Sequence, residues 1–353
     1  IGEYAYYGCS GLSSVEIPQS VTQIGANAFG DCNGLTSVRV PECVTSIKTT
    51  FPNAYQQITS VGLTRTCESI PSGMFSGCAA LASITFPPDI SSIGASAFSG
   101  CVGLSEVVIP ASVKEIGENT FLNCTSLETV SIPSSVEVLG ATAFKGCAAI
   151  KTVVLERADK PLKVLFPDAY RTIENLTVNE LAIEAADFFE GCESLVDVDV
   201  PEDCELYSWT FKDPKFDGDW WIENGWVLGY AGETGTSFVL PEELTKFGGG
   251  TFDGNEEIEE VTFGKDTEVA GGFSNCPELQ IVNFGGSERR IGAYAFWGDT
   301  YLDNVTVPAS VEEIGKEAFL NCSYIQDLAF EGGVRDIAAV SFSNCASLIS
   351  LEL

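Results

Sequence analysis

The sequence predicts a mainly β solenoid, in which short turns of chain stack on one another along an axis. The first observation is a period of 23 residues, which is typical of a repeat array. The second is a stretch in each repeat with apolar residues at every other position, which is typical of a half-buried strand. The third is that one repeat is too short to bury its own apolar stripe, so its neighbours must cover it. The period is marked by Phe75, Phe98, Phe121 and Phe144, and again by Phe273, Phe296, Phe319 and Phe342.

The repeat at 93–115, IGASAFSGCVGLSEVVIPASVKE, shows the elements of one turn in order. The stretch LSEVVIP is a predicted strand, with Val107 and Ile109 on its inner face. Pro110 has no N–H group and therefore ends the strand ladder. The chain then returns in an extended form, with Val113 and Ile116 pointing inward. At this period the 353 residues make roughly 15 turns.

The segment that joins two such stretches, as in ENTFLNC at 118–124, is the predicted turn of each repeat. It is too short for a stable free helix, so we expect one tight helical turn. Two segments depart from the rule, FPNAYQQI at 51–58 and FPDAYRTI at 166–173. Each has Ala where the other repeats have Cys, and each lengthens the turn by one residue.

Ten of the 13 cysteines occupy one slot of the repeat, three residues after the Phe position. Pro214, Asn255 and Asp299 fill the same slot in other repeats, so the slot accepts small residues beside a tight turn. We interpret the ten as a ladder of buried free thiols that act as small apolar residues. They are Cys9, Cys32, Cys78, Cys101, Cys124, Cys147, Cys192, Cys276, Cys322 and Cys345.

Other roles for these thiols are disfavoured. Neighbouring side chains of a parallel ladder keep their Cβ atoms about 4.8 Å apart, which exceeds the usual separation in a disulfide. The chain has no histidine and no Cys-x-x-Cys motif, so it lacks the ligand pattern of a zinc site. A thiol in apolar surroundings is unreactive, which argues against a nucleophile. Cys43, Cys67 and Cys204 lie outside the slot, and a cross-link of any one of them is the less favoured alternative.

The net charge of −32, from 50 acidic and 18 basic residues, limits the class of partner. Phosphate binding needs clustered Lys and Arg, so nucleic acid is excluded and anionic membrane surfaces are disfavoured. No run of about 18 apolar residues occurs, so no membrane insertion is predicted within this segment. The first residues, IGEYAYYGC, lack the features of a signal peptide, and we expect such a leader upstream of Ile1.

The unit IGxxAFxxCxxLxxVxIPxSV resembles the BspA-type leucine-rich repeat, and the resemblance covers nearly the whole chain. It implies a right-handed leucine-rich-repeat solenoid with a parallel sheet on its concave face and with short strands and helical turns on its convex side. It also implies an extracellular role in attachment, because such repeats are common in surface proteins of gut and oral anaerobes and of some mucosal protozoa. Some members are reported to bind fibronectin or fibrinogen. The attachment role comes from the resemblance alone.

The repeats form two series that are separated by an irregular join. We predict a first block at 1–204, a join with a Trp-rich hairpin at 205–250, and a second block at 251–353. Asn224-Gly225 within the join is a strong signal for a tight hairpin. One continuous solenoid is the favoured interpretation, and two separate domains are the alternative.

The outward positions of the predicted strands form the first candidate binding surface. They carry small hydroxyl-bearing residues and become acidic toward the middle of the chain, although an unused sheet face would carry similar residues. The candidates on this concave face are Ser83, Thr85, Glu106, Thr129, Ser131, Thr152, Asp197, Asp199, Glu260, Thr262, Asn304 and Thr306.

A group of aromatic residues in the hairpin is the second candidate, because exposed rings supply rigid contact area for sugars or proteins. The favoured alternative is that these rings fill the join between the two blocks. The group consists of Trp220, Trp221, Trp226 and Tyr230.

Asp213, Asp217 and Asp219, which follow the acidic segment 187–203, are the third candidate because calcium takes oxygen ligands. No twelve-residue loop pattern accompanies them, so a solvated acidic face is favoured, and we predict no metal and no cofactor. The chain also lacks histidine, a G-x-S-x-G motif and a phosphate-binding glycine loop. We therefore predict no catalytic residues and no enzyme.

Together these features predict a non-enzymatic extracellular scaffold for recognition or adhesion, which binds a protein or glycan partner, such as a host matrix protein, at a cell surface. Two alternatives stay open. One is a structural spacer that carries another domain. The other is an intracellular protein-interaction module, which the many free thiols favour.

Overall fold

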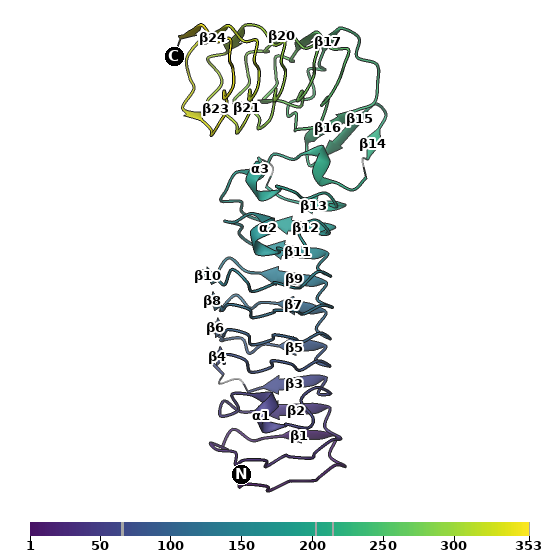
Figure 1. The fold of residues 1–353 in the computed structure, drawn as a ribbon, viewed down its shortest axis with the longest axis vertical. Coiled ribbons are helices and arrows are strands. Elements are labelled where there is room, and N and C mark those ends of the chain that lie inside the picture. Colours follow the sequence, from purple (N-terminus) through teal and green to yellow (C-terminus); the bar gives the residue numbers. More distant parts are fainter. Residues whose placement is uncertain (65–66, 202, 214, 353) are drawn as a thin grey trace. The chain divides into compact units, whose positions relative to one another are not determined.

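The computed structural model describes residues 1–64, 67–201, 203–213 and 215–352 (Figure 1). Pro214, which the sequence assigns to the cysteine slot, lies outside these residues. The chain divides into two compact units, 1–201 (unit 1) and 202–353 (unit 2). The continuity of the solenoid through 205–250 stays a prediction.

Unit 1 is built around a main sheet of short parallel strands, which form two ladders along one side of the stack (Figure 1). Thr129 pairs with Thr152, and Thr152 pairs with Asn175, so the 23-residue period of the sequence is the register of the sheet. One ladder consists of β1 (Ser14–Glu16), β2 (Ser37–Val40), β3 (Ser60–Leu63) and β5 (Ser83–Thr85), and the other of β7 (Glu106–Val108), β9 (Thr129–Ile132), β11 (Thr152–Leu155), β12 (Asn175–Val178) and β13 (Asp197–Asp199).

A second, narrow sheet of unit 1 is made by the returning stretch of each repeat. Its strands pair in parallel and have two residues each. Val107 and Ile109 on the main sheet, and Val113 and Ile116 on the return, are all buried, as the alternation in the sequence predicts. The narrow sheet consists of β4 (Ser69–Ile70), β6 (Ser92–Ile93), β8 (Glu115–Ile116) and β10 (Val138–Leu139).

The joining segment of a regular repeat is a series of tight turns, and not the helical turn that we expected from the sequence. Asn119 and Asn123 have positive φ angles of 57° and 61°, which interrupt a helix. The N–H group of Phe121 instead donates to the carbonyl of Ala143 in the next turn at 2.8 Å. Each joining segment is therefore tied to its neighbour.

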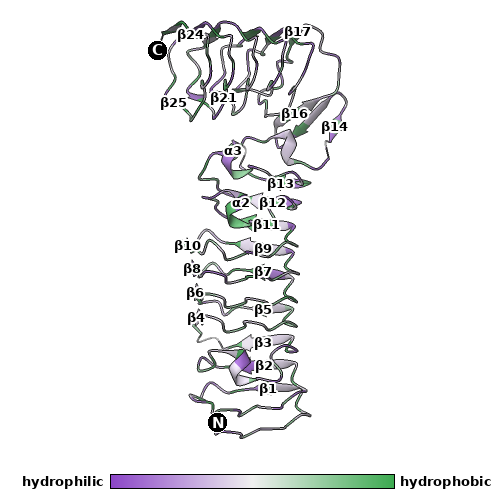
Figure 2. Ribbon diagram, viewed as in Figure 1, coloured by the Kyte–Doolittle hydropathy of each residue, from purple (hydrophilic) through white to green (hydrophobic). Residues whose placement is uncertain are grey.

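The three α-helices of unit 1 occur in its irregular repeats. They are single turns of four residues, and two of them end just before Phe51 and Phe166, the first residues of the two segments that depart from the repeat. The strand register is still 23 residues across both helices, because the extra residue after each Phe is compensated before it. Figure 2 shows α2 as strongly hydrophobic, since its Leu162 and Leu165 are buried. The helices are α1 (Ile47–Thr50), α2 (Leu162–Leu165) and α3 (Ala185–Phe188).

The core of the regular repeats is a column of stacked phenylalanine rings. The ring centroids of Phe98 and Phe121 are 5.3 Å apart, those of Phe121 and Phe144 are 5.2 Å apart, and the planes differ by less than 10° in both pairs. All three side chains are buried. Their recurrence at a fixed spacing therefore reflects one dry interior shared by successive turns.

The cysteine slot has a hydrogen-bonding role as well as a packing role. The Cys124 thiol donates to the carbonyl of Phe98 in the preceding turn at 3.2 Å, and the Cys147 thiol donates to that of Phe121 at 3.0 Å. The Phe98 carbonyl also accepts the N–H of Cys101 at 3.1 Å. The second lone pair of this buried carbonyl is thus satisfied by a small apolar side chain that carries one donor.

All thirteen cysteines are free thiols in the structure. Cys9 departs from the prediction of a buried thiol, because it lies on the first turn and only one neighbouring turn covers it. Burial raises the pKa of Cys78 and of Cys192 to about 12, which leaves these thiols protonated and unreactive at neutral pH.

Unit 2 repeats this architecture with three parallel ladders and its own core. The rings of Phe296 and Phe319 stack with centroids 5.2 Å apart, as in unit 1. Its ladders are β17 (Ser237–Val239), β18 (Glu260–Thr262) and β20 (Ile281–Asn283); then β22 (Val305–Val307), β24 (Asp327–Phe330) and β26 (Ser350–Glu352); and, as the narrow sheet, β19 (Val269–Ala270), β21 (Arg290–Ile291), β23 (Glu313–Ile314) and β25 (Asp336–Ile337).

Residues 203–252, the opening segment of unit 2, do not follow the repeat. A 3₁₀ turn, η1 (Ser208–Thr210), precedes an antiparallel sheet of β14 (Phe216–Asp217), β15 (Trp220–Glu223) and β16 (Trp226–Tyr230). Asn224 and Gly225 join β15 to β16 with positive φ angles of 49° and 79°. These angles fit the two-residue hairpin turn that this dipeptide predicts.

A buried ion pair anchors the opening segment to the repeats of unit 2. The Glu205 side chain is 1% exposed, and its Oε2 lies 3.1 Å from a guanidinium nitrogen of Arg290. The same oxygen accepts the N–H of Ala293 at 3.3 Å. Because both partners of Glu205 come from a later repeat, this contact fixes the segment against the stack.

Two polar residues occupy the cysteine slot in unit 2 by making their own hydrogen bonds. The amide oxygen of Asn255 accepts the N–H groups of Glu257 and Ile258 at 2.9 Å each. One carboxyl oxygen of Asp299 accepts the N–H of Cys276 at 2.8 Å. Burial raises the pKa of Asp299 well above its usual range, which favours its neutral form in this slot.

Candidate functional site

The main sheet of unit 1 presents an outward face of aligned short side chains. Side chains in register on parallel strands lie about 4.8 Å apart, so each outward position forms an evenly spaced row. Exposed Asp197 and Asp199 make one end of this face acidic. The rows across β7, β9, β11, β12 and β13 are Glu106, Thr129, Thr152, Asn175 and Asp197, and beside them Val108, Ser131, Val154, Thr177 and Asp199.

The structure places the predicted binding residues of unit 1 at outward positions of these strands, where they are exposed or half-buried. Within the face, the amide of Asn175, which sequence analysis did not single out, donates to the Thr152 hydroxyl at 3.3 Å. The predicted residues are Ser83 and Thr85 on β5, Glu106 on β7, Thr129 and Ser131 on β9, Thr152 on β11, and Asp197 and Asp199 on β13.

The predicted binding residues of unit 2 are held by hydrogen bonds to neighbouring strands. The Glu260 carboxylate on β18 accepts from the Ser237 hydroxyl at 3.3 Å and from the Asn283 amide at 2.8 Å. The Asn304 amide oxygen accepts the N–H of Asp327 at 3.2 Å, so this side chain links two turns just before β22. Thr262 on β18 and Thr306 on β22 complete the set.

The four predicted aromatic residues of the hairpin divide into two pairs. Trp221 and Trp226 are 3% and 1% exposed, so they pack inside unit 2. Trp220 and Tyr230 are half-buried and contact each other with ring centroids 4.4 Å apart. Only the second pair keeps ring area for a ligand.

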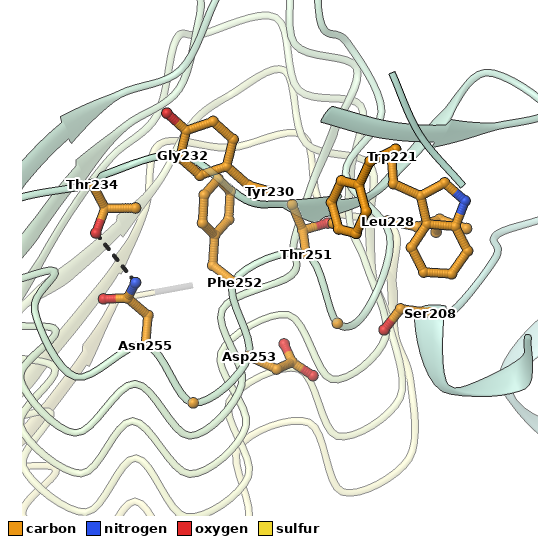
Figure 3. Close-up of a pocket in the computed structure, with 14 residues that line it drawn as sticks. Ser208, Trp221, Leu228, Tyr230, Gly232, Thr234, Thr251, Phe252, Asp253 and Asn255 are labelled. Atoms are coloured by element: carbon orange, nitrogen blue, oxygen red, sulfur yellow. Dashed lines mark hydrogen bonds between the residues drawn. The ribbon is translucent and has the colours of Figure 1, made fainter. Parts of the chain in front are cut away.

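A pocket of about 390 Å³ opens beside the hairpin, between β16 and residues 250–255 of the following turn (Figure 3). This volume falls in the range of pockets that bind small molecules. Phe216, Tyr230 and Phe252 supply apolar wall, and the pocket is also lined by bare backbone at glycines such as Gly229 and Gly254.

Polar side chains of the pocket come from three separate segments. Ser208 belongs to η1, Thr234 follows β16, and Asp253 and Asn255 lie on the next turn. The amide nitrogen of Asn255 donates to the Thr234 hydroxyl oxygen at 3.2 Å, as Figure 3 shows. Figure 3 also shows Ser208 and Asp253 with their oxygen atoms toward the open space.

Sequence analysis did not find these polar pocket residues, although it did single out Tyr230 and Trp221. Ser208, Thr234 and Asp253 occupy no slot of the repeat, and they meet only because the irregular segment folds back on the next turn. The sequence signal that could have found them is the density of glycine around the hairpin, at Gly229, Gly232 and 248–250, which indicates close approach of backbone.

Metal-binding and membrane-spanning features were also sought in the described parts of the chain. No group of three or more Cys, Asp or Glu side chains among those residues is arranged to hold a metal ion. In the same residues, no helix has the length and apolar character needed to cross a bilayer.

The constant register, the column of phenylalanines and the parallel ladders define a leucine-rich-repeat solenoid, which confirms the predicted fold class of about 15 turns. The model of the BspA-type leucine-rich-repeat region matches residues 1–99, 48–164, 95–216 and 230–349. The chain therefore belongs to the BspA-type leucine-rich-repeat family, as the repeat pattern predicts. Solenoids of this class are interaction scaffolds with extended binding faces.

Solved structures similar to this chain are also leucine-rich-repeat proteins. A leucine-rich-repeat protein from Bacteroides ovatus is 27% identical over 95% of this chain and 85% of its own, with a TM-score of 0.37. A leucine-rich cell surface protein from Faecalibacterium prausnitzii is 20% identical over 96% and 86%, with a TM-score of 0.35. The pneumococcal vaccine antigen PcpA is 18% identical over 93% and 76%, with a TM-score of 0.30. No curated protein matches the chain in sequence.

Proposed function

We propose that this chain is a non-enzymatic recognition scaffold at a cell surface, which binds a protein or glycan partner through the outward face of its main sheet in unit 1. The observation that carries the proposal is the in-register array across β7, β9, β11, β12 and β13. Such an array offers a rigid, extended surface of short side chains, which is the form of the binding faces of solenoids.

The chemistry of this face favours a partner with basic or hydroxyl groups. Asp197 and Asp199 are exposed at one end, and the chain carries a net charge of −32. A negative surface steers positively charged partners toward it and repels anionic ones. Threonine and serine in the middle of the face supply hydrogen-bond donors and acceptors that suit a protein or a glycan equally.

The location at a cell surface is supported by membership of the family and by the state of the thiols. Buried thiols with raised pKa, such as Cys78 and Cys192, resist oxidation, so the folded chain tolerates an oxidising exterior. The absence of catalysis is supported by the lack of histidine and by the short, mostly exposed side chains of the face.

A direct test measures binding of the full chain to immobilised fibronectin, fibrinogen and an array of surface glycans. The double substitution Asp197→Asn and Asp199→Asn removes two exposed charges from the face, and we expect roughly tenfold weaker binding at low salt. Glu115→Gln with Asp159→Asn is the matched control, because it removes two exposed charges outside the main sheet. The control should bind as the original chain does.

Two outcomes contradict the proposal. The first is the absence of saturable binding to every protein and glycan tested, which favours a structural spacer. The second is equal weakening by both double variants, which would mean that net charge and not this face governs binding.

A further inference from the structure

The pocket beside the hairpin of unit 2 suggests a second, more selective site. We propose that it binds one neutral pyranose ring of a glycan, with the ring held against aromatic side chains and its hydroxyl groups bonded to the polar rim. This site is separate from the main sheet of unit 1, because every residue that lines it lies between 208 and 255.

The apolar part of the pocket matches the C–H face of a sugar ring. Phe216 is 44% exposed, and its ring lies over the backbone of Gly229, where an added Cβ would be only 3.2 Å from the ring. Tyr230 is half-buried and packs on Phe252 with centroids 5.6 Å apart, so its position is fixed by neighbours. Rings that are held in place bind a ligand without a large loss of side-chain entropy.

The polar part of the pocket has hydrogen-bonding capacity left for a ligand. The Thr234 hydroxyl accepts one bond from Asn255, so its own proton can bond to a ligand, as can the second N–H of the Asn255 amide. The Ser208 hydroxyl can donate and accept. One oxygen of Asp253 accepts the N–H of Ser274 at 3.0 Å, and the other can accept from a sugar hydroxyl.

The glycines of the pocket keep this space open. Gly250 has a φ angle of +97°, and a Cβ at this position would lie 1.7 Å from the Ser208 hydroxyl oxygen. A side chain there would therefore displace Ser208 from the pocket. Gly254, also with positive φ, has no atom within 4 Å of an added Cβ, so its backbone faces open space.

The charge of the lining selects a neutral ligand. No Lys or Arg lines the pocket, and the single carboxylate of Asp253 repels an anion. A cation would find only that one carboxylate, and the described residues around it hold no metal-binding group. A neutral polyol with one apolar face uses both the rings and the mixed donors and acceptors of the rim.

The experiment is a titration of the full chain with glucose, galactose, mannose and N-acetylglucosamine, followed by saturation-transfer NMR and calorimetry. We expect saturable binding of at least one of them, with transfer strongest to the C–H protons of the ring. Phe216→Ala removes the exposed ring and should weaken binding roughly tenfold. Ser208→Ala, a smaller change, should weaken it in the same direction.

Matched controls lie on the same unit. Ile222→Ala removes a side chain of the same hairpin that is 46% exposed and outside the pocket, and Ser287→Ala removes an exposed hydroxyl elsewhere. Both should bind sugar unchanged, and the thermal midpoint of each variant shows whether unit 2 is still folded. Because Asp197→Asn with Asp199→Asn should not affect sugar binding, failure here is distinguishable from failure of the face in unit 1.

Three results would overturn the proposal. One is no saturable binding of any of the four sugars. Another is binding that Phe216→Ala and Ser208→Ala leave unchanged in folded protein. The third is binding of methylammonium, and not of sugars, in a manner that Asp253→Asn abolishes, which would make the pocket a cation site.

Discussion

The regular turns of unit 1 near 94–147 and the opening segment of unit 2 satisfy their buried polar groups in different ways. In the regular turns, Gly94, Gly117 and Gly140 each donate to the carbonyl of the Ile found 24 residues earlier, at 2.8–2.9 Å. In the opening segment, Ser208 bonds to Gly249, while Glu205 reaches Arg290. One rule of spacing therefore stabilises the first region, and individual contacts stabilise the second.

This difference has a consequence for function. A surface built by a spacing rule is broad and uniform, as on the outward face of β7 to β13. A surface built by individual contacts can close around a space, as beside the hairpin. The predictions below test the contrast in order of expected effect.

The largest effect should come from the column of rings in unit 1. Phe121→Ala empties a fully buried position between two stacked rings, and we expect a loss of about 3–5 kcal/mol in the free energy of unfolding. Urea unfolding of the full chain measures it. Val138→Ala on β10, where the side chain is 54% exposed, should change stability by no more than about 0.5 kcal/mol. Equal losses in the two variants would refute the shared interior.

The next effect tests the individual contacts of the opening segment. Arg290→Met leaves the buried Glu205 carboxylate without its guanidinium partner, at an expected cost of about 2–3 kcal/mol. We place it below the usual cost of breaking a buried pair because the Arg290 side chain is 19% exposed. Hydrogen exchange should show the loss in unit 2 and not in unit 1.

The control for this variant is an exposed ion pair of the same unit. Arg335 lies 3.2 Å from Glu312 with 77% of its side chain exposed, so Arg335→Met should cost at most about 0.5 kcal/mol. A loss at Arg335 as large as that at Arg290 would show that burial is not what makes the Glu205 contact important.

A smaller effect distinguishes two members of the same slot. Cys101→Ala removes a buried thiol that donates to the Phe75 carbonyl at 3.2 Å, and should cost about 1–2 kcal/mol. Cys9→Ala, at an exposed position, should change stability by less than about 0.5 kcal/mol. A thiol reagent added to folded protein should modify Cys9 and spare Cys101. Rapid modification of Cys101 without unfolding would contradict its burial.

The smallest effect should be the same in both regions. Asn123 in a regular turn and Asn224 in the hairpin both have positive φ angles, 61° and 49°, so replacement of either by Ala should cost about 1 kcal/mol. Glycine at either position should be tolerated, because it adopts this conformation without a steric penalty. Thermal unfolding of the four variants makes the comparison, and a cost confined to one region would show that context outweighs backbone geometry.

The parts of the molecule that follow the spacing rule could be predicted from the sequence. Phe121 and Cys101 recur at fixed intervals because their surroundings recur, and Asn224-Gly225 announces its turn by local geometry alone. Glu205 and Ser208 carry no such mark, since their partners come from distant, non-repeating positions. The helical turn expected at 118–124 was wrong because the positive φ angles of the two asparagines there depend on hydrogen bonds to the next turn.

The sulfur-to-carbonyl bonds between successive turns also bear on how the chain matures. Cys124 is shielded only when the turns on both sides are in place, because its thiol bonds to Phe98 in the preceding turn and its carbonyl-bearing neighbour Phe121 accepts the Cys147 thiol of the following one. A newly made chain therefore has thirteen accessible sulfurs, and it loses nearly all of them as coiling proceeds. The interval before coiling is complete is the period in which an oxidant could join sulfurs wrongly, so rapid growth of the stack from any nucleus protects the protein chemically as well as structurally.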